Sequence, residues 1–220
     1  GNFSGPAEVL MSTRNPGRGG DGHASEQMRF AVDNPEGASN MTVHWVVREA
    51  NNARWWVIDN IVVKGGPAPF VPKLGDALFF ESFDYVSLST VSSTHVSHLE
   101  LTGDVVTAVP PQDWLVDNSN FVLGGCESFR GWRFWDYDAW ATDIGGGDRS
   151  DFFGYGTIAV FDSDQASKCP FTEAVHTILR TPEIQLSQRL GPNSLVLWFQ
   201  SQFLPLDWMT IEVIAYLDGA

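Results

Sequence analysis

The side chains best suited to chemistry in this sequence are carboxylates within or beside apolar, strand-like segments. Asp59 interrupts the apolar run WWVIDNIVV, and Asp162 and Asp164 form a second acidic pair in FDSDQ. A carboxylate in a core must be ion-paired, hydrogen-bonded or bound to a metal, because burying it bare is costly. Calcium prefers such oxygen ligands. Both a calcium site and a purely hydrogen-bonded structural role are open for Asp59, whereas a DxD pair alone is common in solvated turns.

The two cysteines, Cys126 and Cys169, fit no CxxC or metal-ligand spacing. They are either a disulfide, which we favour, or two buried thiols. In the chain-entropy model, a bond closing a loop of about 44 residues would stabilise the fold by about 4 kcal/mol. A disulfide would indicate a location outside the cytosol. Asn2 and Asn40 begin glycosylation sequons, which support export only weakly.

Aromatic residues are abundant, with nine tryptophans. Four aromatic residues crowd one segment: Trp132, Trp135, Tyr137 and Trp140. Their rings could stack on sugars, but such spacing is equally typical of a β-sandwich core, to which we assign Trp55, Trp56 and Trp198. The sequence contains no nucleophile elbow, phosphate-binding loop, HExxH motif or dinucleotide fingerprint. We therefore expect a protein that is not an enzyme.

The composition indicates a folded, acidic protein. The chain has 220 residues with 43% hydrophobic residues, and 27 acidic against 13 basic residues give a net charge of −14. This charge argues against nucleic acid and anionic membranes as partners, because both are negatively charged. Apolar runs are strand-sized and far shorter than the roughly 20 residues of a membrane span, so we expect no membrane insertion.

Alternation of apolar and polar residues predicts an all-β fold. In residues 209–217, Met209, Ile211 and Val213 share one face, with Thr210 and Glu212 opposite. Five other segments alternate in the same way, namely 43–47, 55–63, 156–161, 176–181 and 195–203. Short strands separated by Gly, Pro, Asn and Asp indicate an antiparallel β-sandwich or jelly roll.

The order of the segments predicts a circularly rotated domain. Residues 65–76 are rich in Pro and Gly and resemble a linker, so we expect residues 1–64 to be the last strands of a jelly roll and 77–220 its first part. The final Asp218-Gly219 is a hairpin-turn signal that demands a further strand. Residues 1–64 of the same or a neighbouring copy could supply it. Tandem repeats, strand donation between subunits and a permuted monomer all satisfy this order.

Several motifs resemble the concanavalin-like, MAM-like jelly-roll accessory domains of secreted bacterial proteins, of the choice-of-anchor J or cleaved-adhesin type. They are FFESFD near a domain start, GWRFWDYDAW, GTIAVFDSDQ, IEVIAYLDG and finally WWVIDNI at a domain end, in rotated order. The resemblance implies a non-catalytic role in adhesion, glycan binding or assembly. It also implies structural calcium, with Glu81 beside Asp59, and Asp162 and Asp164 as a second acidic cluster.

The function expected from these observations is structural. We expect an extracellular or cell-surface fibre, built from copies of this chain that are linked in tandem or exchange strands. Its main partner would be the chain itself. The alternative is a carbohydrate-binding or adhesion module of a secreted enzyme, with glycans as partners.

Overall fold

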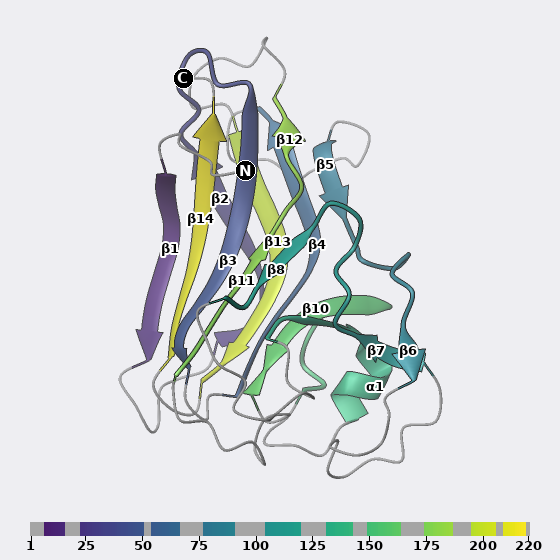
Figure 1. Ribbon diagram of the computed structural model, residues 1–220. Coiled ribbons are helices and arrows are strands. Elements are labelled where there is room, and N and C mark those ends of the chain that lie inside the picture. The colour runs from purple at the N-terminus through teal and green to yellow at the C-terminus, as the bar shows by residue number, and fades with distance from the viewer. Residues whose placement is uncertain are drawn as a thin grey trace.

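The computed structural model describes residues 7–15, 23–50, 54–66, 77–90, 104–119, 131–142, 149–163, 174–186, 195–205 and 209–218. Within these ranges, two antiparallel sheets lie face to face and one short helix lies at one end (Figure 1). The predicted antiparallel β-sandwich is therefore confirmed. No helix among these residues is long and apolar enough to span a lipid bilayer.

The six-stranded sheet contains both the first and the last strand of the chain. Its strands, in spatial order, are β1 (Ala7–Asn15), β14 (Met209–Asp218), β3 (Asn40–Ala50), β11 (Val175–Arg180) and β8 (Leu115–Asp117), and β12 (Ile184–Gln185) also pairs with β3.

The eight-stranded sheet forms the second layer. In spatial order it consists of β2 (His23–Val32), β13 (Leu195–Leu204), β4 (Trp55–Gly65), β10 (Thr157–Asp162), β9 (Arg133–Asp136), β7 (Asp104–Thr107) and β6 (Ser89–Thr90), and β5 (Ala77–Glu81) pairs with the later part of β4. The helix α1 (Tyr137–Thr142) directly follows β9.

The first strand of the chain lies beside the last. β1 pairs antiparallel with β14, from Ala7 opposite Tyr216 to Asn15 opposite Met209. The strand that the C-terminal turn demands is therefore supplied by the same chain. Further along, β3 pairs with β11 and β14, and β4 pairs with β10 and β13. Segments 1–64 and 77–220 thus contribute strands to both sheets, while residues 67–76 of the proposed linker lie outside the described residues.

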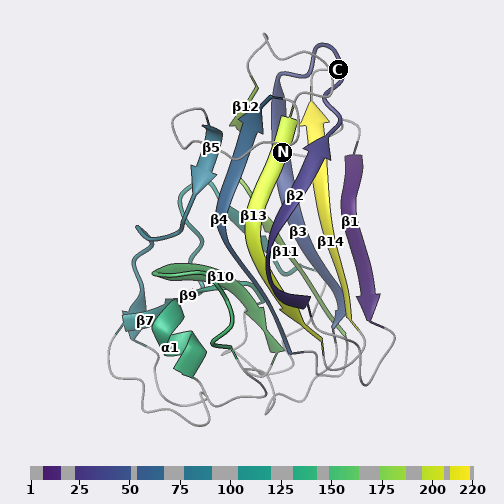
Figure 2. The ribbon, with the colours of Figure 1, turned by 180° about the vertical axis from the view of Figure 1, so that it is seen from behind.

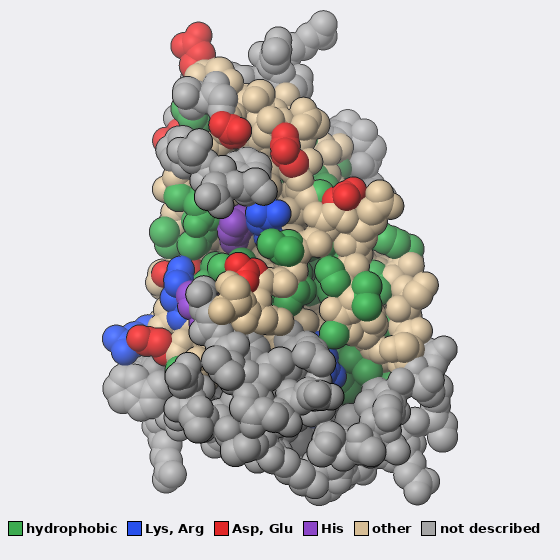
Figure 3. Space-filling view, viewed as in Figure 1, with side chains coloured by type: hydrophobic (Ala, Val, Ile, Leu, Met, Phe, Trp, Pro, Cys, Tyr) green, Lys and Arg blue, Asp and Glu red, His purple; other side chains and the backbone are tan. Residues whose placement is uncertain are grey.

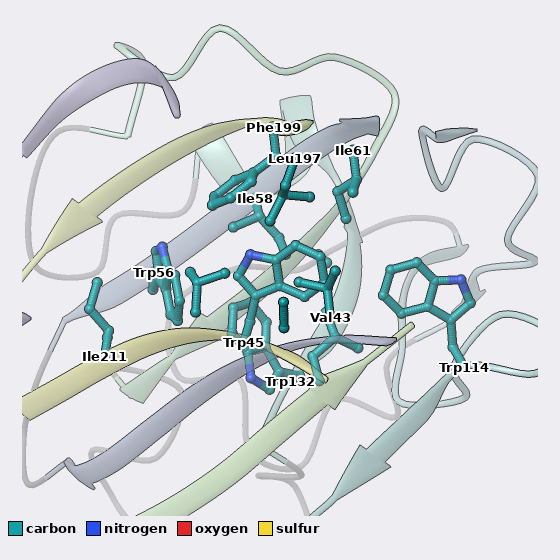
Figure 4. Packing of buried hydrophobic residues seen from close by; sticks show 14 of the residues in the cluster. Val43, Trp45, Trp56, Ile58, Ile61, Trp114, Trp132, Leu197, Phe199 and Ile211 are labelled. Carbon is teal, nitrogen blue, oxygen red and sulfur yellow. The ribbon is translucent and has the colours of Figure 1, made fainter. Parts of the chain in front are cut away.

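The main core lies between the two sheets and is rich in tryptophan (Figure 4). Trp45 on β3 meets Phe199 on β13 edge to face, with ring centroids 5.5 Å apart. Trp56 packs against Trp132 at 5.4 Å. Alternating residues of each strand enter this core, which is why the period-two pattern predicted the strands well.

A second, smaller core covers one half of the outer face of the eight-stranded sheet. It contains Trp55, Val57, Val106, Trp135, Trp140, Phe152, Ile158 and Val160. The guanidinium of Arg149 lies 4.7 Å from the ring centroid of Trp55 and 5.4 Å from that of Trp140. Its Nη2 is 2.8 Å from Oδ2 of Asp162, which also accepts a hydrogen bond of 3.0 Å from Nε1 of Trp140. This core therefore contains a buried ion pair between aromatic rings.

Replacing Arg149 should destabilise the protein strongly. Arg149→Met leaves the buried carboxylate of Asp162 without its cation, and we expect the free energy of unfolding to fall by about 3 kcal/mol or more. Adding Asp162→Asn should recover part of this loss. Arg14→Met is the control, because Arg14 and Glu49 form an ion pair that is 60% and 59% exposed and should contribute less than about 1 kcal/mol. Urea unfolding followed by tryptophan fluorescence measures all four proteins. Equal effects of Arg149→Met and Arg14→Met would contradict the prediction.

Candidate functional site

On the other half of the outer face of the eight-stranded sheet, a row of paired residues crosses the strands β2, β13, β4 and β5, which lie side by side in Figure 2. Trp198 on β13 is paired with Arg29 on β2 and with Val62 on β4, and Val62 is paired with Phe80 on β5. Directly paired residues project to the same side of a sheet, and the alternating positions 197 and 199 enter the main core. The row therefore faces outward. Arg29 is exposed, Trp198 is half-buried and Phe80 is 40% exposed.

A polar row lies next to it. Gln27 on β2 is paired with Gln200 on β13, which is paired with Asp59 on β4. A bulge follows in β4, where Asn60 has φ 51°, a conformation that Asn tolerates better than most residues. The bulge brings the side-chain amide of Asn60 between Asp59 and Gln200. Nδ2 of Asn60 is 2.9 Å from Oδ2 of Asp59 and 2.9 Å from Oε1 of Gln200.

Asp59 is a buried carboxyl group with unusual acid–base properties. It has no exposed surface, and it accepts hydrogen bonds from the backbone N–H groups of Asn60, at 2.7 Å, and of Tyr155. Burial raises its pKa to about 8, because the charged form loses hydration, and the nearby carboxylates of Asp84 and Glu81 add to the increase. The hydrogen bonds oppose this shift but do not cancel it.

A loop at residues 152–156 forms a rim beside these rows. Phe152 enters the second core with 3% exposure, whereas Phe153 and Tyr155 are 68% and 63% exposed. The backbone N–H of Phe153 donates to Oγ of Ser25 on β2 at 2.9 Å, and that of Tyr155 donates to Asp59 on β4. The loop is therefore held to β2 beyond Gln27 and to β4 at the end of the polar row. We call Phe80, Phe153, Tyr155 and Trp198 the aromatic platform.

The turn after β5 holds the other side of this loop. Oδ1 of Asp84 accepts a hydrogen bond of 3.1 Å from the backbone N–H of Thr157. Gly156 has φ 67°, and a Cβ at this position would collide with the Asp84 carboxylate. Only glycine adopts this positive φ without strain and also leaves room for the Asp84 carboxylate.

The buried carboxylate of Glu81 accepts hydrogen bonds from the same turn and from Trp114. Its Oε1 accepts from the backbone N–H of Phe83 at 2.7 Å, and its Oε2 accepts from the Tyr85 hydroxyl at 2.7 Å and from Nε1 of Trp114 at 3.1 Å. Glu81 is only 3% exposed. These donors satisfy the buried carboxylate, as burial requires.

The three predicted calcium ligands that the structure describes therefore have protein partners. Oxygens of Asp59, Glu81 and Asp162 accept hydrogen bonds from protein groups, and Asp162 is also neutralised by Arg149. Among the described residues, no group of three or more His, Cys, Asp or Glu side chains could hold a metal ion. This arrangement does not form the oxygen cage that calcium requires, and calcium binding stays a prediction.

Some predicted residues lie outside the described ranges, namely Asn2, Cys126, Asp164 and Cys169. The disulfide and the roles of Asn2 and Asp164 therefore stay predictions. Asn40 is the first residue of β3 and is partly buried between β14 and β12. Its glycosylation likewise stays a prediction.

The structure places the crowded aromatic segment inside the protein. Trp132, Trp135 and Trp140 have no exposed surface, and Tyr137 is partly buried against the second core. Their burial gives a sugar no ring face to stack on, so it does not support glycan contact by these residues. Trp55 and Trp56 lie in cores as expected, but Trp198 faces outward. The segment LVLWFQSQF already indicated this outward position, because Trp198 falls at the same alternate positions as the polar residues Gln200 and Gln202.

The outer face of the six-stranded sheet is different in character (Figure 3). Nε of Arg48 is 2.6 Å from Oε2 of Glu212, and its Nη1 is 3.2 Å from Nε2 of His176. The ring of His44 is tilted against that of Tyr216, with centroids 4.4 Å apart, and burial together with Arg180 lowers the pKa of His44 to about 4. The groups on this face largely satisfy one another, and we assign no ligand to it.

Comparisons of the chain with protein-family models, curated proteins and solved structures found no match. The resemblance to concanavalin-like domains stays a prediction.

The acid–base behaviour of Asp59 should appear in the stability of the protein. Because its pKa is about 8 when folded against an ordinary 3.8, the folded state keeps a proton that the unfolded chain releases. The stabilisation is complete below about pH 4 and is lost as the pH rises to about 8. The melting temperature of the wild type should therefore fall between pH 5 and pH 8.5 by about 10 °C more than that of Asp59→Asn.

Differential scanning fluorimetry with EDTA present measures this difference. The control is Asp113→Asn, an exposed aspartate at φ 65° where Asn fits the backbone. Parallel pH profiles for the wild type and Asp59→Asn would contradict the raised pKa.

Proposed function

We propose that this chain is a non-catalytic carbohydrate-binding or adhesion module of an extracellular or cell-surface protein, with the aromatic platform as its binding surface. The single observation that carries the proposal is the outward position of these rings beside amide groups. Phe80, Phe153 and Tyr155 are 40%, 68% and 63% exposed, and Gln27 and Gln200 lie in the adjoining row.

The chemistry of this surface suits sugars. One face of a sugar ring presents C–H groups that pack on aromatic rings, while its hydroxyl groups need hydrogen-bond partners at the edge. The platform supplies rings, and the polar row supplies amides that can donate and accept. Large exposed apolar side chains grouped on one face are also characteristic of binding sites.

A non-catalytic role agrees with the state of the carboxylates. Glycosidases use two carboxyl groups that flank the bond to be cleaved. In the described part of the chain, the buried carboxyls of Asp59, Glu81 and Asp162 accept hydrogen bonds from protein groups. Each supports a turn, a bulge or an ion pair, so the proposal assigns them structural roles.

Removing exposed rings should weaken sugar binding without unfolding the protein. Phe80→Ala and Tyr155→Ala should each lower the affinity for a bound polysaccharide about tenfold, because each removes stacking surface. The control is Tyr216→Ala on the outer face of the other sheet. Calorimetric titration with β-glucan, mannan, galactan and polygalacturonate measures the affinities. The proposal fails if the wild type binds none of them, or if the three variants behave alike.

A fibre built from copies of this chain is a second candidate, and the position of β1 favours it. Within the described ranges, β1 is the outermost strand of its sheet and pairs with β14 alone. The same pairing could form with β1 of a neighbouring copy, which would join two sandwiches by main-chain hydrogen bonds. Both partners of the exchange would keep a complete sheet.

Locking β1 onto its own chain tests this candidate. Val9 is paired with Ile214, so Val9→Cys with Ile214→Cys can form a disulfide across the two strands. Light scattering should show wild-type protein that elongates with concentration, a locked protein that stays monomeric, and elongation again after reduction. Reduced wild-type protein is the control for the native cysteines. A wild type that is monomeric at every concentration would contradict the fibre.

A further inference from the structure

We propose that the aromatic platform binds a sugar that carries a carboxylate, with the sugar ring packed at Trp198 and Phe80 and the carboxylate on Arg29. This inference rests on the proposed carbohydrate-binding function and names the class of its ligand. The proposed contacts come from one row of paired residues, which extends from β2 to β5.

Arg29 is the cation of this row. It is exposed and lies directly opposite Trp198. Among the described residues its one hydrogen bond is a long contact of 3.4 Å from Nη2 to Oε1 of Gln27, and it forms no ion pair with them. An arginine with no carboxylate partner in the described part of the chain is notable, because acidic residues outnumber basic ones by 27 to 13.

The geometry of Arg29 matches a carboxylate on a ligand. A guanidinium presents a planar fork of N–H donors that can hold both oxygens of a carboxylate at once. The long contact with Gln27 uses only Nη2 and leaves the other donors for a ligand. Because Gln27 offers its Oε1 to Arg29, its Nε2 is left to donate to the same ligand.

The other charged groups on this half of the face do not compete for that role. Asp59, in the adjoining row, has no exposed surface and is held by Asn60. Lys64 lies two residues beyond Val62 on β4, has the same parity and is 8% exposed. Glu26 has the opposite parity to Gln27 and Arg29 along β2, so its side chain starts from the other side of the strand. Arg29 and Lys64 therefore supply positive charge to this half of the face, and Asp84, beside the polar row, accepts a hydrogen bond from the backbone N–H of Thr157.

Trp198 and Phe80 complete the site on the apolar side. Val62, which is 3% exposed, lies between them in the row. A sugar ring placed over Val62 would contact an aromatic side chain on each side. Its carboxylate would then lie toward β2, where Arg29 is opposite Trp198. Neighbouring strands lie about 5 Å apart, so along the sheet the backbone of Arg29 is about 5 Å from that of Trp198 and about 10 Å from that of Val62, a gap that the long arginine side chain can reduce.

A matched pair of polysaccharides tests the inference. Polygalacturonate and its fully methyl-esterified form share one backbone but differ in charge, and EDTA keeps calcium from gelling the acid form. Wild-type protein should bind the acid form about tenfold more tightly, because the ester cannot accept the charged bidentate contact. Added salt should reduce this preference. Alginate serves as a second polyuronate with different ring stereochemistry.

Variants of Arg29 test whether this residue causes the preference for the acid form. Arg29→Gln should lower the affinity for polyuronate five- to tenfold, a loss of about 1 to 1.4 kcal/mol, and leave the affinity for the ester unchanged. Arg29→Lys should recover part of the loss, because it restores charge without the fork. Arg14→Gln on β1 is the matched control, since Arg14 is an exposed arginine of an edge strand in the other sheet.

The outcomes separate this inference from the function on which it rests. Binding of neutral polysaccharides that is lost in Phe80→Ala, with no preference for polyuronate or no effect of Arg29→Gln, overturns the inference and leaves the carbohydrate-binding module intact. Failure of the wild type to bind any of the polysaccharides overturns both. Equal loss in Arg29→Gln and Arg14→Gln indicates a general effect of charge and also overturns the specific contact.

Discussion

Strand β4 is the constraint on which the rest of the structure depends. It pairs with β13 along one side and with β10 and then β5 along the other. Its residues from Trp55 to Lys64 are all buried, and those from Trp55 to Ile58 alternate between the second core and the main core. A strand that is buried along its length and paired along both edges cannot shift its register without moving every partner. The bulge at Asn60 is therefore held in place, and with it Asp59 and the polar row.

Burial and charge act together on the outer face of the eight-stranded sheet. The second core covers one half of that face, and the buried pair of Arg149 and Asp162 lies within it. Phe152 belongs to this core, so the core also determines where Phe153 and Tyr155 emerge. A structural cluster thus positions exposed rings beside the uncovered half. The two halves of the outer face therefore differ in role. The half under the second core stabilises the fold, and the half with the aromatic platform is the proposed binding surface.

Alternation in the sequence predicted the strands because half of each strand faces an apolar core, and burial selects residue type at every second position. It also predicted the need for a strand after the C-terminal turn, which β1 supplies. Three features were missed, although the alternation did indicate the first. Trp198 was assigned to the core by residue type, although its parity in the strand points outward. The bulge at Asn60 depends on the partner strands, and the rim formed by Phe153 and Tyr155 depends on contacts with residues more than 90 positions away in the chain.

The pairing of β1 with β14 has a consequence for the architecture of larger proteins. Since Ala7 lies opposite Tyr216, the chain enters and leaves the sandwich at neighbouring points, about 5 Å apart in a sheet. A domain with such closely spaced ends can be inserted into a surface turn of a host protein without separating the host residues on either side of the turn. The end of the sandwich away from Ala7 and Tyr216 would then project from the surface of the host.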